Sequence, residues 1–428
     1  MRADETAAFA SLYNAFVPDG QCLPSAGAAR FSNTSCFNSQ WVKPIDSLAS
    51  TNSGPNTSDT DVWGAALTLD WNAGPVDLKS ITAYRELDLQ VSQEITASPS
   101  YFNSIGQDIG FDQLSEELQL SGKAFGEKLE YLVGAYGLRE QGTQVFPVNL
   151  TLVQFVSGGL IDNRSYAGFG QLTYRFTDRF AATAGLRYTD ETREFNPQQQ
   201  IAGYQAQTNV DGYTNPLTGA FGPPGSPLFP PGWYERSDTA TTGSLTFDFK
   251  MTSDLYSYFT YSEGFKGGGF VMRYFPPVVP AAGTDPDSLV GYAKPETARL
   301  YEFGIKSEWF DRRLRINAAV FRTDYEDLQI TFNVDPDGAG PIGAFVPVLA
   351  NAGEARLQGI ELETQLAAAD WLRIDASAGY LDASYRSFSA LAVQQLPALP
   401  EELPNAPEFT ANAGFVADFA ENDMGRWF

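Results

Sequence analysis

Hydrophobic and polar residues alternate with a period of two along most of this chain. Between Trp371 and Asp382 one set of alternate positions is mainly apolar and the other is polar or small: the first is Leu372, Ile374, Ala376, Ala378 and Tyr380, and the second is Arg373, Asp375, Ser377 and Gly379. The same alternation runs through 180–189 and 301–306 and recurs from about Trp63 onward. Because the side chains of a β-strand point alternately to the two faces of a sheet, this pattern predicts an all-β fold.

The predicted strands are long for a soluble protein. They run for roughly ten to sixteen residues and often end in Tyr, Trp or Phe, whereas strands of soluble sandwiches typically have about five or six residues. Alternating segments of about ten residues with aromatic ends are typical of antiparallel barrels in the outer membrane. On this interpretation Ile374 lies near the middle of its strand and faces lipid, while Ser377 faces the lumen.

Short and long connections alternate between the predicted strands. Short turns are expected at 73–75, 124–127, 177–179, 251–254, 311–312 and 368–370, and long loops at 96–109, 146–163, 196–235, 272–294, 333–344 and 388–404. A compact soluble domain rarely contains so many long loops. Outer-membrane barrels combine short periplasmic turns with long extracellular loops. The connections therefore favour a transmembrane antiparallel β-barrel.

Composition agrees with a barrel and excludes other classes. No uncharged apolar run approaches the roughly 18 residues of a spanning helix, and the mean hydropathy of -0.23 suits a wall that is apolar on one face only. The 428 residues carry a net charge of -24, which argues against nucleic acid as a partner because phosphate neutralisation requires basic patches. We attribute this acidity to solubility and surface repulsion in preference to cation capture.

The chain contains no histidine. Catalytic triads that use a histidine base and the usual zinc sites with histidine ligands are therefore excluded. Paired carboxylates could still do acid-base work, but each pair lies in a strand alternation or near a strand end, where a solvated lumen or rim charge is the better interpretation. The pairs are Glu116 with Glu117, Glu361 with Glu363, and Asp324 with Glu326 and Asp327. We predict no enzyme, no metal site and no cofactor.

The two cysteines, Cys22 and Cys36, lie in an opening stretch rich in Gly, Ser, Asn and Pro. Their spacing fits no zinc motif. A disulfide closing this loop of about 15 residues would contribute about 3 kcal/mol in the chain-entropy model, and an oxidising compartment would allow it. We predict a Cys22–Cys36 bridge, with two unpaired cysteines as the alternative.

A glycine-rich run, GFKGGGF, occupies residues 264–270. A phosphate-binding loop would be followed by a helix, but here Pro276 and Pro277 follow soon afterwards. Glycines in a strand more often mark a bulge, a bend or the close approach of another backbone. We expect one of these in the barrel wall.

Several longer strings resemble the barrel of TonB-dependent receptors. They are, in order, SITAYR at 80–85, EELQLSG at 116–122, YFTYSEGFKGGGF at 258–270, PETARLYEFGIK at 295–306, RLRINAAVFRTDYEDLQ at 313–329, NAGEARLQGIELE at 351–363 and LPNAPEF at 403–409. The resemblance covers roughly residues 61–419. It implies a Gram-negative outer-membrane barrel of about 22 strands that imports a scarce ligand, most often a ferric siderophore, with energy from the TonB system.

The resemblance also sets expectations for the domains. We expect an extracellular, loop-like segment at 1–58 and a partial barrel at 59–428, with about 13 of the 22 strands. We recognise no signal peptide, plug domain or TonB box in the sequence, and so expect a piece of a longer gene product. Partners would be outer-membrane lipid, TonB through the missing plug, and a small ligand such as a ferric siderophore.

Two functional alternatives remain. A passive porin or structural barrel would not require the receptor-like strings, and a barrel enzyme would require a lumenal catalytic cluster. The residues that bind ligand are not identified by the sequence. The loops at 196–235 and 272–294 are the candidates, because long surface loops on a rigid scaffold concentrate binding residues. The first is rich in Gln, Asn, Tyr, Pro and Gly with little charge. This composition suits hydrogen bonding and stacking on a bulky polar ligand, and it equally suits a plain solvated loop.

Overall fold

The structure is a computed structural model that describes residues 56–94, 104–149, 154–203, 222–229, 232–272, 290–334, 346–395, 399–418, 420–422 and 425–427. Almost all the regular structure of these residues is antiparallel β. The elements are β1 Thr57–Asn72, β2 Val76–Glu94, β3 Ser104–Ala124, β4 Leu129–Asn149, β5 Gln154–Arg175, β6 Phe180–Pro197, β7 Gln200–Gly203, β8 Tyr234–Lys250, β9 Leu255–Lys266, β10 Gly269–Phe270, β11 Tyr292–Ala293, β12 Glu296–Trp309, β13 Leu314–Val334, β14 Val346–Ala369, β15 Leu372–Phe388, α3 Ala390–Gln395, β16 Phe409–Ala417, β17 Ala420–Asn422 and β18 Gly425–Trp427.

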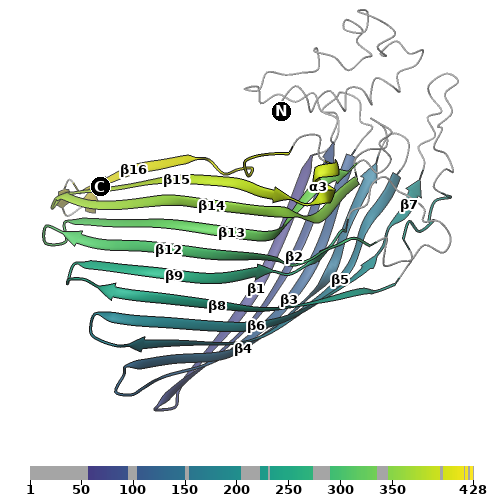
Figure 1. The fold of residues 1–428 in the computed structure, drawn as a ribbon. Helices are drawn as coiled ribbons and strands as arrows, with labels where there is room; N and C mark the ends of the chain where they lie inside the picture. Colours follow the sequence, from purple (N-terminus) through teal and green to yellow (C-terminus); the bar gives the residue numbers. More distant parts are fainter. Residues whose placement is uncertain are drawn as a thin grey trace, which may run out of the picture.

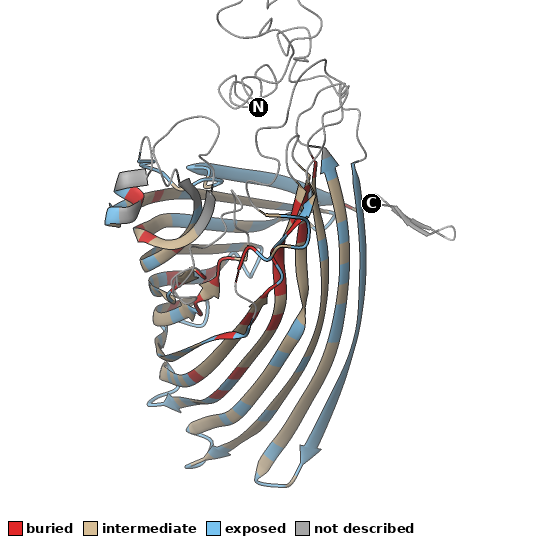
Figure 2. Ribbon diagram, turned by 90° about the vertical axis from the view of Figure 1, so that its right-hand side faces the viewer, coloured by how far each residue is buried: buried red, intermediate tan, exposed pale blue. Residues whose placement is uncertain are grey.

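One large sheet forms the wall of the molecule. Within the described residues it has 14 strands, and its order follows the chain from β1 to β16, with β7 pairing to β5 beside the main path. The sheet curves into a trough with a concave and a convex face (Figures 1 and 2). The strands that the described ranges place at its two edges, β1 and β16, pair only with β2 and β15. The prediction of an antiparallel meander with short turns at one end is confirmed.

The predicted tight turns lie at one end of the trough (Figure 1). At the turn between β12 and β13, Phe310, Asp311 and Arg312 all have positive φ angles of 54°, 53° and 67°. Left-handed backbone reverses the chain within a few residues but is disfavoured for residues with a Cβ. The register Trp309↔Leu314 shows that pairing nevertheless continues to the last residue before the turn.

The strands are longer than predicted. β14 has 24 residues and β5 has 22, whereas a tilted strand needs only about 9 to 11 residues to cross the hydrocarbon core. The expected loop at 146–163 is wrong for this reason. β4 and β5 continue through most of it and pair from Asn149↔Gln154 onward. The proline and glycines in this segment suggested a loop, but apolar residues between them pack on the concave face and extend the hairpin.

The loop expected at 388–404 also contains regular structure. Residues Ala390–Gln395 form the short helix α3, which Ser389 caps through its side-chain oxygen and the amide of Ala392 at 3.4 Å. Among the described residues, no helix combines the length and the apolar character needed to cross a membrane.

An apolar band follows the convex face. On β1, Trp63 and Trp71 are 59% and 65% exposed and lie on one face with Leu67 and Leu69 between them. Tryptophan is enriched where an apolar surface meets water, and the interval between these two residues matches the length of a spanning strand. The two tryptophans therefore mark the upper and lower limits of the band.

The register across the second half of the sheet shows the same band. One row of laterally paired residues is apolar or aromatic throughout: Phe259, Phe303, Val320, Ile360, Tyr380 and Phe409. A second apolar row lies next to the short turns: Trp309, Leu314, Leu366, Ile374 and Phe415. Leu362 pairs with Ala318 and Ala378 and lies between the two rows.

These rows confirm one sequence expectation and correct another. Ile374 lies on the convex face, and Ser377, paired with Glu363, lies on the concave face. However, Ile374 is not near mid-strand. β15 runs on to Phe388, so Ile374 lies close to its first residue, Leu372, and to the turn. The alternation fixed its face, but only the full extent of the strand fixes its depth.

Candidate ligand-binding wall

The concave face is the candidate site, because loop segments fold onto it. Alternation along β6 places Phe195, Arg193, Glu191 and Arg187 on this face, and Phe195 is only 1% exposed. Figure 2 shows buried residues concentrated where irregular segments lie inside the trough, toward the end with the long loops. The wall is therefore covered there and open toward the short turns.

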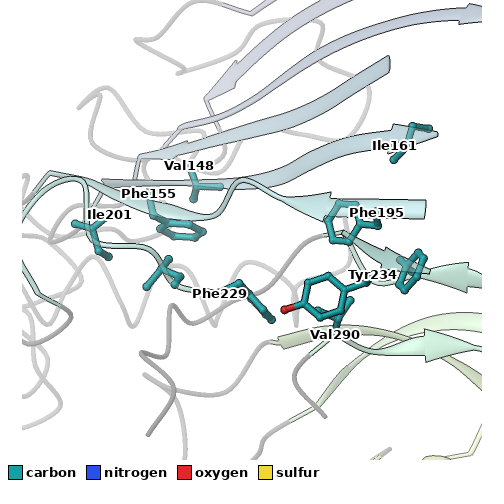
Figure 3. Packing of buried hydrophobic residues seen from close by; sticks show 10 residues of the cluster. Val148, Phe155, Ile161, Phe195, Ile201, Phe229, Tyr234 and Val290 are labelled. Atoms are coloured by element: carbon teal, nitrogen blue, oxygen red, sulfur yellow. The ribbon is translucent and has the colours of Figure 1, made fainter. Parts of the chain in front are cut away.

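A cluster of apolar side chains, here called the lumenal cluster, holds two loop segments against the wall (Figure 3). Residues 222–229 pack there together with β7, and β10 and β11 pack beside them. Burying each large apolar side chain contributes about 1.5 to 3 kcal/mol. The members are Val148, Phe155, Ile161, Phe195, Ile201, Leu228, Phe229, Tyr234, Phe270 and Val290.

Backbone hydrogen bonds fix the first of these segments. The amide of Leu228 donates to the carbonyl of Gln199 at 2.9 Å, and the amide of Ile201 donates to the carbonyl of Ser226 at 3.1 Å. Together with the apolar contacts, these bonds give part of the predicted loop 196–235 a defined position inside the trough.

The paired strands β10 and β11, here called the hairpin stem, follow directly from the glycine-rich run 264–270. β9 ends at Lys266, and the chain turns inward at Gly267 and Gly268. A Cβ on Gly268 would lie 2.3 Å from the hydroxyl oxygen of Tyr292, so only glycine fits there. A bend was one of the expected features and it is present, but the group that approaches Gly268 is the side chain of Tyr292 and not another backbone.

Polar contacts join the hairpin stem to the wall. Both the Gly268 amide, at 3.1 Å, and the Tyr292 hydroxyl donate to Oδ2 of Asp238. Burial, and then the hydrogen bond to Asp238, raise the pKa of Tyr292 well above its usual value. A phenol is protonated at neutral pH in any case, and the raised pKa keeps Tyr292 a donor in more alkaline solution. From β13, the Nε2 of Gln329 donates to the carbonyls of Gly267 and Lys294 at 3.0 and 2.9 Å.

Toward the short turns the concave face is polar and carries tyrosines. Tyr258 donates to Glu302 at 2.5 Å, Tyr256 donates to Asp248, and the Lys306 ammonium lies 5.7 Å from the centre of the Tyr258 ring. Such a wall offers hydrogen bonds and aromatic surface together. Hydrogen-bonding and aromatic groups are also the ones that line small-molecule binding sites in proteins.

The predicted carboxylate pairs lie in different places. Glu361 and Glu363 are on the concave face, in line with the expectation of lumen charges. Glu116 is on the convex face between Leu114 and Leu118, where it accepts hydrogen bonds from Ser80, at 2.7 Å, and Thr82. The expectation of a lumen or rim charge was wrong for Glu116, because alternation places the two glutamates of the pair 116–117 on opposite faces.

Two members of the third predicted group, Asp324 and Glu326, are neutralised by arginines. Asp324 accepts from Arg322 and Arg356 at 2.8 and 2.6 Å, and Glu326 pairs with Arg299 at 3.0 Å. No group of three or more acidic or cysteine side chains that could hold a metal ion occurs among the described residues. The ion pairs of Asp324 and Glu326 are structural contacts.

Some sequence predictions lie outside the described residues. They include Cys22 and Cys36, so their bridge stays a prediction, and most of segment 1–58. The candidate loops 196–235 and 272–294 are described only in part, but those parts contact the wall through the lumenal cluster.

The sequence profile of the family described as "TonB dependent receptor-like, beta-barrel" matches residues 14–428. The chain belongs to this family. It is therefore a β-barrel protein of the Gram-negative outer membrane, as the strings at 258–270 and 295–306 indicated.

Individual relatives agree with the family. The pesticin receptor of Yersinia enterocolitica serotype O:8 is 26% identical over 215 residues, which cover 50% of this chain and 25% of the receptor. A probable TonB-dependent siderophore receptor, PiuA of Acinetobacter baumannii, is 27% identical over 161 residues, or 35% of this chain and 20% of the relative. The chain thus aligns with about a quarter of the length of these curated relatives.

Solved structures show the same fold. The ferric yersiniabactin uptake receptor FyuA of Yersinia pestis superposes with a TM-score of 0.65 at 17% identity, covering 87% of this chain and 49% of the receptor. The copper transporter OprC gives a TM-score of 0.56 at 14% identity, covering 86% of this chain and 52% of that protein. The chain therefore corresponds to about half of each solved receptor, and the convex band is the lipid-facing surface of a TonB-dependent receptor barrel.

Sequence reasoning missed the contacts between Asp238, Tyr292 and the glycines. Asp238 lies at a polar position of an alternating strand, so its type and face were readable. Its partner Tyr292 lies far along the chain in a segment predicted to be a loop. The alternation of hydrophobic and polar residues gives no information about a contact between Asp238 and Tyr292.

Proposed function

We propose that this chain forms the wall of a TonB-dependent outer-membrane transporter for high-affinity uptake of a scarce ligand, a ferric siderophore in the first place. The observation that carries the proposal is the concave face of a receptor-family barrel onto which the hairpin stem and residues 222–229 are fixed. Loops fixed against a rigid wall support a receptor, because binding residues concentrate on loops that a rigid scaffold positions.

The chemistry of the wall supports a bulky polar ligand. Tyrosine hydroxyls, carboxylates and ammonium groups line the face, including Tyr258, Glu302 and Lys306. A relative named as a siderophore receptor and a structural neighbour named as a ferric yersiniabactin uptake receptor support the choice of ferric chelates. The copper transporter among the structural neighbours has the same fold, so the choice of iron rests on the siderophore receptor among the relatives.

The deciding experiment measures uptake of radiolabelled iron complexes by iron-starved cells that carry the complete receptor containing this chain. We expect uptake that disappears when the host tonB gene is deleted, because a wall by itself has no source of energy. Uptake that persists without TonB would support a passive pore instead.

Loop deletions in the same cells test where the ligand binds. Removing 204–221 or 273–289, which lie between described segments, should weaken ligand affinity while the wall strands still pair. Unchanged affinity after both deletions would move the binding site away from these loops.

A further inference from the structure

Arg187 is held in an unusual position on the concave face. Its guanidinium carbon lies 5.4 Å from the centre of the Tyr136 ring and 5.5 Å from the centre of the Phe169 ring. Its Nε donates to the Thr189 hydroxyl at 3.1 Å. Two cation–π contacts and one hydrogen bond fix the plane of the side chain before any ligand arrives.

Among the residues that the structure describes, no carboxylate forms an ion pair with Arg187. Other arginines on the concave face pair with carboxylates: Arg193 with Glu191 at 3.1 Å and Arg315 with Glu308 at 2.9 Å. The Nε of Arg187 is occupied by Thr189, so the two terminal amino groups remain for a ligand.

The surface beside Arg187 is small and rich in hydroxyl groups. Arg187 pairs across the sheet with Thr242, and Gly185 pairs with Ser244. The Ser244 hydroxyl lies close to Gly185: a Cβ placed on that glycine would be 2.7 Å from the hydroxyl oxygen. Hydroxyl donors next to a fixed guanidinium complete a cradle for a planar anion.

We propose that Arg187 is an anion-binding site of the lumen wall that takes a carboxylate group of the transported metal chelate. A guanidinium fork matches the two oxygens of a carboxylate in one plane. Stacking on Tyr136 and Phe169 reduces the side-chain entropy lost on binding. This inference rests on the proposed function, since it assigns one ligand group to the same wall.

A pair of matched probes tests it. One is the ferric complex of a trihydroxamate chelator with a single pendant carboxylate, and the other is its primary amide, which has nearly the same size without the charge. Binding of both, labelled with radioactive iron, is measured on outer membranes containing the complete receptor. We expect the wild-type protein to bind the carboxylate at least about tenfold more tightly than the amide.

Three variants separate charge from structure. Arg187→Gln should abolish the preference for the carboxylate and leave the affinity for the amide unchanged. Arg187→Lys should keep only part of the preference, because an ammonium is a point charge without the planar fork. Arg315→Gln, which removes an arginine already neutralised by Glu308, should leave the preference intact. Immunoblots confirm equal amounts of each variant in the membrane.

The possible failures are distinguishable. Equal binding of the two probes to the wild-type receptor, or a preference that survives in Arg187→Gln, would overturn the role of Arg187 alone. Failure of the wild-type receptor to bind either chelate would count against ferric-chelate uptake, and with it against a chelate carboxylate at Arg187.

Discussion

Single residues on the concave face act through contacts that tolerate little change. A Cβ placed on Gly268 would lie 2.3 Å from the hydroxyl oxygen of Tyr292. A Cβ placed on Gly264, four residues earlier, would have no atom within 4 Å. Tyr292 in turn shares Oδ2 of Asp238 with the Gly268 amide. Packing therefore requires a glycine at position 268 but not at position 264.

The two glycines make a matched test of the hairpin stem. Gly268→Ala should displace Tyr292 from Asp238 and open the stem, at a cost of about 1 to 3 kcal/mol for overpacking. Gly264→Ala should be neutral or slightly stabilising. Hydrogen exchange of the Val271 amide, which donates to Gly291 at 2.9 Å, is the measurement. Exchange that is equally slow in both variants would show that the contact with Tyr292 does not hold the stem.

At the scale of elements, each strand carries two surfaces whose roles depend on depth as well as face. In β14 and β15 the lipid-facing pair Leu366 and Ile374 lies beside the short turns. The lipid-facing pair Ile360 and Tyr380 lies at the opposite limit of the apolar band. Leu362 lies between them. A charged side chain on this face lowers the stability of the folded barrel most at the midplane of the bilayer.

The loss of stability caused by an arginine on the lipid face should therefore depend on the depth of the substituted residue in the bilayer. Leu362→Arg should destabilise the folded barrel by about 2 to 4 kcal/mol, and Ile374→Arg by only about 0 to 1 kcal/mol because it lies near the interface. Ser377→Arg, on the lumenal face beside Glu363, should cost little. Unfolding titrations of the receptor in lipid vesicles give the three free energies. Equal losses at Leu362 and Ser377 would show that the face assignment is wrong.

At the scale of the whole molecule, one sheet separates a lipid-facing surface from a lumen. The convex face presents rows of exposed apolar side chains, including Trp63, Trp71 and Phe415. The concave face carries the hydrogen-bonded polar groups and the lumenal cluster. The net charge of -24 is not confined to the lumen, because Glu116 lies on the convex face, where hydrogen bonds from Ser80 and Thr82 satisfy its carboxylate.

This division of surfaces predicts how the protein fractionates. The complete receptor should remain in the outer-membrane fraction after carbonate extraction, because the apolar band requires lipid or detergent, and its circular dichroism should be dominated by β structure. Recovery as a soluble monomer from the carbonate supernatant would contradict the membrane assignment.

The sequence by itself determined the class of fold, the positions of the tight turns and the faces of Ile374 and Ser377. A period of two is a local property of extended backbone, and tight turns depend on a few adjacent residues, so Ile374 and Ser377 were assigned correctly to opposite faces. The receptor-like strings identified the family. These signals do not depend on contacts between distant parts of the chain.

The tertiary structure decided what lies inside the trough and how far each strand extends. Phe155, Ile201 and Leu228 are each less than 2% exposed, yet they come from a strand end and from loop segments that meet only in the folded chain. Their burial stabilises the extension of β4 and β5 through a segment where proline and glycine suggested a loop. The ring contacts of Arg187 likewise join three strands, and the depth of Ile374 follows from the full length of β15. Each depends on side chains packing across the sheet, which a local pattern does not encode.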